Sequence, residues 1–108
     1  MNQFSDREKA FESKFAHDEE LQFKVGARRN KLLGLWAAEI MGLSDDDAAE
    51  YAKEVVKADF EEAGHEDVYR KVKGDLDAKH LDISEHRVRK AMDDLLAEAR
   101  NQVMNEVS

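Results

Sequence analysis

Apolar residues recur along most of the chain at three- and four-residue spacing, which is the period of helices that bury one face. The pattern is densest between Lys31 and Leu43, where five residues share one face: Leu33, Trp36, Ala37, Ile40 and Met41. Leu32 and Leu35 lie on the remaining side, so this stretch is apolar nearly all round. Such a helix is typical of the middle of a bundle.

The same spacing, read with helix start and stop signals, predicts four helices over residues 19–42, 45–63, 65–79 and 84–106. Gly42 is a predicted C-terminal cap of the first helix. Ser44 and Ser84 are predicted N-caps of the second and fourth helices. Because the loops are short, we expect consecutive helices to run roughly antiparallel. The expected fold is all-α, a four-helix bundle over residues 19–108.

The first 18 residues differ from this bundle. Ser5 and Glu8 have the spacing of a capping box, and Phe4, Phe11 and Phe15 fall on one side of a helical wheel. An isolated helix of this length is marginal in water. We therefore expect a mobile, weakly helical N-terminal segment. Its phenylalanines would pack either on the chain's own bundle or in a groove of another protein, and the spacing alone favours neither.

Composition agrees with a helical protein of a reducing compartment. There is no Pro, and charged residues make up 39% of the chain. The absence of Cys excludes disulfides and thiolate chemistry. No secretory signal pattern is visible, and the apolar stretch around Trp36 is too short and carries Glu39, so it is not a membrane anchor. We expect a soluble cytoplasmic protein without direct membrane insertion.

Charge is unevenly distributed along the chain. The net charge of −8 argues against nucleic-acid binding. Residues 44–64 hold eight acidic side chains against Lys53 and Lys57, whereas residues 24–31 hold four basic side chains and no acidic one. The two segments either attract one another as neighbouring helices or form a surface for a partner.

The chain offers little chemistry of its own. It has no phosphate-cradling glycine loop and no His-Glu-x-x-His pair. We predict no catalytic residue, metal site or cofactor, and the protein is not expected to be an enzyme. Arg28, Arg29 and Arg87 are candidate anion-binding residues. They support an alternative function, an anion- or nucleotide-sensing helical bundle that regulates a partner protein.

Four stretches together resemble one known family: Asp6–Glu12, Lys14–Asp18, Ala27–Glu39 and Ala52–Glu62. The family is the zeta subunit, the ATPase inhibitor protein of alphaproteobacterial F-type ATP synthases. The resemblance extends from about Phe4 to Arg100. Two positions depart from the family pattern, namely Gly26, where a helix-favouring residue is commoner, and Ile40, where Lys is often found.

The resemblance implies a four-helix bundle behind a mobile inhibitory segment, here residues 1–18. It implies that this segment blocks ATP hydrolysis by inserting at a catalytic α/β interface against the central stalk. The implied partners are the α, β and γ subunits of the catalytic head, on the cytoplasmic face of the membrane-bound synthase. The implied contact residues are those of the phenylalanine stripe and two nearby cations: Phe4, Arg7, Phe11, Lys14 and Phe15.

Overall fold

The computed structural model describes residues 19–61 and 65–107. These residues form four helices, α2 (Glu19–Met41), α3 (Asp45–Glu61), α4 (His65–Ala78) and α5 (Glu85–Val107), and contain no strand. The all-α, four-helix fold is therefore confirmed for this part of the chain. The helix bounds differ from the predicted ranges by at most two residues. The predicted mobile segment, residues 1–18, lies outside the described residues, and the division at residue 18 stays a prediction.

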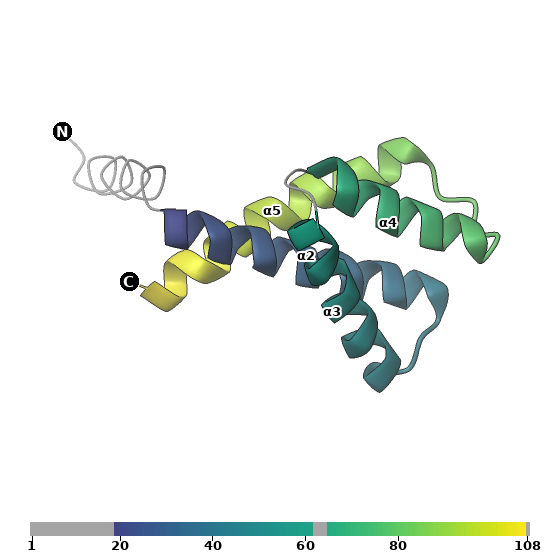
Figure 1. The fold of residues 1–108 in the computed structure, drawn as a ribbon, viewed down its shortest axis with the longest axis horizontal. Coiled ribbons are helices and arrows are strands. Elements are labelled where there is room, and N and C mark those ends of the chain that lie inside the picture. Colours follow the sequence, from purple (N-terminus) through teal and green to yellow (C-terminus); the bar gives the residue numbers. More distant parts are fainter. Residues whose placement is uncertain (1–18, 62–64, 108) are drawn as a thin grey trace.

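The first and last helices form the long axis of the molecule (Figure 1). α2 and α5 run side by side in opposite directions, while α3 turns back from the end of α2 and crosses it obliquely. α4 then reverses direction again and leads into α5. α2 contacts each of the other three helices. The prediction that the apolar stretch of α2 belongs to the middle of the bundle is therefore confirmed.

A glycine sets how closely α2 and α3 approach at their crossing. A Cβ atom at Gly34 would lie 2.6 Å from the Cα atom of Ala52 and 3.2 Å from a methyl carbon of Val55. Because the nearest atom belongs to the backbone of α3, it cannot move aside as a flexible side chain would. The crossing therefore requires glycine on α2 and a small residue on α3.

The buried apolar residues form two clusters of unequal size. All four helices contribute to the larger one, which includes Leu33, Val55, Val72 and Val88. The smaller one lies between α2 and α5 alone, where Val25 packs with two residues of α5, Ala99 and Val103. We call the two parts of the molecule around these clusters the wide end and the narrow end.

The apolar stretch of α2 is not buried on every side as its composition suggested. Leu33 is completely buried, but Trp36 and Ile40 are only half-buried against the larger cluster. Leu35 keeps 36% of its surface exposed. Among the described residues three helices contact α2, and Leu35 lies on a side of α2 that they leave partly exposed.

Short-range signals define the helix ends as predicted. Gly42 adopts a φ of 74° after the last turn of α2, the left-handed conformation of a C-terminal cap. The Ser44 hydroxyl oxygen accepts the backbone N–H of Asp47 at 3.3 Å. The Ser84 hydroxyl oxygen accepts that of Arg87 at 3.1 Å. Both predicted N-caps are therefore confirmed.

α4 ends in the same way as α2 but without a glycine. His80 has a φ of 58°, its N–H is donated to Asp77 O at 2.9 Å, and the N–H of Leu81 is donated to Leu76 O at 3.1 Å. This pair of hydrogen bonds is the Schellman motif. The sequence indicated only a connection here, because histidine is not the residue that usually signals a left-handed cap.

Candidate functional site

The five residues predicted to contact a partner, Phe4, Arg7, Phe11, Lys14 and Phe15, lie outside the described residues. The structure does describe the helix that comes directly after them along the chain. α2 begins at Glu19, and its first turns pack against the last turns of α5 to form the narrow end. The narrow end is therefore the part of the described bundle nearest in sequence to the predicted contact residues.

A polar contact joins the two helices of the narrow end. The guanidinium of Arg28 on α2 forms an ion pair with Glu106 of α5 at 2.7 Å. It also donates a hydrogen bond to the side-chain oxygen of Gln102 at 2.8 Å. We call these three residues the Arg28 contact. The side chain of Arg28 is 28% exposed and that of Glu106 is 47% exposed, so solvent and salt weaken the attraction.

Arg29 lies next to this contact but is almost completely buried, with 3% of its surface exposed. Its Nε donates a hydrogen bond to the side-chain oxygen of Asn30 at 2.7 Å. Burial lowers the pKa of Arg29, and the negative charges of Asp59 on α3 and Asp93 on α5 oppose that shift. Arginine remains protonated despite such a shift, so a positive charge lies where three helices meet.

The contacts of Arg28 and Arg29 show which acidic residues lie near the basic segment of residues 24–31. The predicted attraction between residues 24–31 and the acidic second helix is present in the effect of Asp59 on Arg29. The ion pair of Arg28, however, is formed with α5. The sequence did not indicate this partner, because Glu106 is the last acidic residue of the chain and lies far from Arg28 in sequence.

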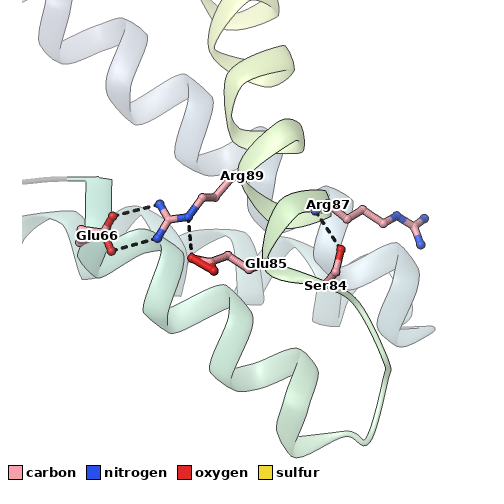
Figure 2. A network of polar contacts seen from close by, with 5 residues as sticks. All are labelled: Glu66, Ser84, Glu85, Arg87 and Arg89. Atoms are coloured by element: carbon pink, nitrogen blue, oxygen red, sulfur yellow. Dashed lines mark hydrogen bonds and ion pairs between the residues drawn. The ribbon is translucent and has the colours of Figure 1, made fainter.

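A second polar network ties α4 to α5 at the wide end (Figure 2). The Arg89 guanidinium makes two hydrogen bonds to Glu66, at 3.0 and 3.2 Å, and a third to Glu85 at 3.1 Å. Its Cζ also lies 4.0 Å from the centre of the Tyr69 ring. The hydrogen bonds to the two carboxylates raise the pKa of Arg89. Each charged group in this arrangement has a partner of opposite charge, which gives it the character of a structural link.

Arg87 is adjacent to this network but takes no part in it. Its backbone N–H donates a hydrogen bond to the Ser84 hydroxyl oxygen. Its side chain extends away from Arg89 and the two carboxylates (Figure 2). On α5 it precedes Gln102, a partner of Arg28, by 15 residues, or about 22 Å along the helix. The structure therefore does not bring Arg28, Arg29 and Arg87 together, and anion binding by any of them stays a prediction.

Tyr51 links α3 to α4 through a buried hydroxyl. The hydroxyl donates to Asp75 at 2.8 Å, and the ammonium of Lys71 donates to the same carboxylate oxygen at 2.9 Å. Lys71 also lies 5.3 Å from the centre of the Tyr51 ring. Burial raises the pKa of Tyr51, and the hydrogen bond to Asp75 raises it further. A tyrosine held in its neutral form is suited to a structural role rather than to acid–base catalysis near neutral pH.

An apolar groove lies between α2 and α3, with a volume of about 340 Å³. Its apolar walls come from Leu35, Ala49, Ala52 and Val56, and the ammonium-bearing side chains of Lys31 and Lys53 complete it. We call it the α2–α3 groove. The sequence did not predict it, because the apolar spacing of a single helix does not show where two helices leave space between them.

Two classes of site are not found in the described part of the chain. Between residues 19 and 107, leaving out 62–64, no three His, Cys, Asp or Glu side chains are grouped so that they would hold a metal ion. None of the described helices has the length and apolar character needed to cross a bilayer.

Comparison with known proteins places the chain in context. The family model of ATPase inhibitor subunit zeta matches residues 1–102. A protein whose structure was solved by solution NMR is 60% identical in sequence, with a TM-score of 0.71. The alignment covers 80% of this chain and 98% of that chain. No match was found among curated proteins.

Proposed function

This chain belongs to the ATPase inhibitor subunit zeta family, and we propose that it inhibits ATP hydrolysis by inserting residues 1–18 into an F-type ATP synthase. In this proposal the segment enters a catalytic α/β interface of the head and meets the central stalk, formed by the γ subunit. The single observation that carries the proposal is that the family match includes both the phenylalanine-striped segment and the bundle behind it.

The segment supplies the binding free energy in this mechanism. Phe4, Phe11 and Phe15 each contribute about 1.5–3 kcal/mol when fully buried. Ordering the segment on its partner offsets part of that gain. Arg7 and Lys14 lie together on one flank of the stripe on the helical wheel and are the polar contact residues in this proposal. The inhibitor acts by obstruction and catalyses no reaction.

The bundle is the carrier of this segment. Its buried core at the wide end keeps the fold intact, and the α2–α5 pair connects that core to residue 19. Since the catalytic head lies on the cytoplasmic side of the membrane, the protein acts on that side.

Removal of the segment tests the proposal. Purified cognate ATP synthase is assayed for ATP hydrolysis with the full chain and with residues 19–108 alone. We expect the shortened protein to keep its helical circular dichroism and to lose inhibition. Undiminished inhibition by a folded shortened protein contradicts the proposal.

Substitutions within the segment separate the stripe from the rest of it. Phe11→Ser with Phe15→Ser removes apolar surface and is expected to raise the inhibitory concentration at least a hundredfold, by about 3 kcal/mol or more. Lys9→Gln with Ser13→Asn is the matched control, because both positions lie on the opposite side of the helical wheel from the stripe, and its effect should stay within a few-fold. Equal effects of the two pairs would mean that the stripe is not the binding face.

A further inference from the structure

The α2–α3 groove has the composition of a docking site for another protein. Four apolar side chains line it, and Leu35 is one of the few large apolar residues that the described chain leaves exposed. Leu35 belongs to neither buried cluster. The groove exists because Gly34 draws α2 close to Ala52, while the small Ala49 and Ala52 leave space beside the crossing.

The two cations at the groove are only weakly neutralised by carboxylates of the described chain. Lys31 has no ion pair among residues 19–61 and 65–107, and Lys53 is paired only with Glu50 of its own helix, at 3.3 Å. Both members of that pair are 74% exposed, so the attraction is weak. By contrast, Lys73 and Lys90 have carboxylate partners within 2.9 Å. On a chain of net charge −8, this groove therefore favours a negatively charged partner.

The openness of the groove indicates which kind of partner fits. Four of its six lining residues are exposed: Lys31, Leu35, Ala49 and Lys53. A small molecule in such a groove would stay largely in water, whereas typical ligand sites bury most of the ligand surface. An amphipathic helix can place one large apolar side chain in the groove and continue beyond it on both sides. Carboxylates one turn before and after that side chain would meet the two lysines.

We propose that the α2–α3 groove is a second docking site of the inhibitor and binds an acidic amphipathic helix of the ATP synthase. This inference rests on the proposed function, because it takes the synthase as the partner. The groove residues of α2 follow Glu19 by 12 to 16 positions, or about 18–24 Å along the helix. The groove and the N-terminal segment can therefore be engaged at the same time, and the second contact raises the effective concentration of the first.

Charge reversal at the groove in the full chain tests the inference. Lys31→Glu with Lys53→Glu is expected to raise the concentration needed for half-inhibition of hydrolysis roughly tenfold at low salt. The difference from the wild type should shrink as salt is added. Inhibition at saturating protein should remain complete, because residues 1–18 are unchanged.

Two further variants make the result specific. Lys79→Glu reverses an exposed charge at the end of α4, away from the groove, and should leave the half-inhibition concentration within about twofold of the wild type. Leu35→Gln removes the exposed apolar side chain without touching either buried cluster, and should raise that concentration several-fold. Thermal unfolding of each variant establishes that it is folded.

The outcomes separate this inference from the function on which it rests. If the wild type fails to inhibit the synthase, the proposed function is wrong. If the wild type inhibits and the folded Lys31→Glu, Lys53→Glu variant inhibits equally well, only the docking site is wrong. If the Lys31→Glu, Lys53→Glu variant does not fold, Leu35→Gln is used in its place. Inhibition by Leu35→Gln as strong as that by the wild type would then overturn the inference.

Carbodiimide crosslinking identifies the occupant directly, because it joins an amine to a carboxylate with which it is in contact. With the full chain bound to the synthase, mass spectrometry should find Lys31 or Lys53 joined to an Asp or Glu of a synthase subunit. The inference would be overturned if these lysines were crosslinked only to residues 1–18 or to a second copy of this chain. It would also be overturned if no crosslink from these lysines were found.

Discussion

The two ends of the bundle are built differently although they share α2 and α5 (Figure 1). At the wide end ten buried residues from four helices, together with Ile83 of the connection between α4 and α5, form one core, whereas at the narrow end three buried residues lie between two helices. The narrow end therefore gains less from apolar burial. It adds the partly exposed Arg28 contact, which is weakened by solvent.

This difference assigns separate tasks to the two ends. Regions with few buried contacts open locally at a lower free energy than the core of the same protein. We expect the narrow end, which leads into residues 1–18, to open without unfolding of the wide end. In the proposed function, the segment that inserts into the synthase is therefore attached to the part of the bundle that is expected to open at the lower free energy.

The largest expected effect is on the free energy of unfolding, when one buried valine at each end is replaced by alanine. Val72→Ala at the wide end removes a completely buried side chain and should lower the free energy of unfolding by about 2–3 kcal/mol. Val25→Ala at the narrow end should cost about 1 kcal/mol, because two helices can close over the space more easily than four. Urea unfolding followed by the fluorescence of Trp36 measures both. Equal losses would show that the two ends are equally well packed.

Two glycines of α2 allow the two ends to be compared with the same change, Gly to Ala. We expect this change to lower the stability at one position and to raise it at the other. Gly34→Ala should destabilise the protein by about 2 kcal/mol, since the new methyl group meets the backbone of Ala52 at 2.6 Å. Gly26→Ala should stabilise it by about 0.5–1 kcal/mol, because nothing lies within 4 Å and alanine is the better helix former. Thermal unfolding of the two variants checks the signs, and a stabilising Gly34→Ala would contradict the close crossing.

The Arg28 contact should matter locally rather than globally. Arg28→Ala is expected to cost about 0.5–1 kcal/mol at low salt, and less at high salt. Amide hydrogen exchange should quicken in the last turns of α5 and change little at the wide end. Lys90→Ala is the control, because it breaks an ion pair with Asp94 inside α5 alone. A uniform change across the chain would mean that the narrow end does not open separately.

The smallest expected effect is a change of stability with pH that involves Tyr51 at the wide end. It is absent near neutral pH. Its pKa is raised above the ordinary value of 10.0, chiefly by burial. The neutral hydroxyl therefore contributes stability that is fully present below pH 10 and is lost as the pH rises further. The free energy of unfolding should fall more steeply between pH 9.5 and about 11 for the wild type than for Tyr51→Phe. Parallel curves would exclude the buried hydroxyl as the cause.

Helices and their ends could be predicted because their signals are local. Gly42, Ser44 and Ser84 act on the backbone within four residues of their own positions. The cap at His80 was missed for the same reason, since histidine carries no local signal for a left-handed conformation. The neighbouring hydrogen bonds of Leu76 and Asp77 hold it there.

The sequence by itself determined the all-α class, the four helices and the central place of α2, because spacing and capping depend on residues close together along the chain. It did not determine which sides of α2 are covered. Trp36 and Leu35 have the same apolar character as Leu33, yet Leu33 alone is fully buried. The partner of Arg28 on α5, the crossing at Gly34 and the α2–α3 groove are likewise decided by the tertiary structure. Each depends on how two helices distant in sequence meet, and the period of a single helix carries no information about that.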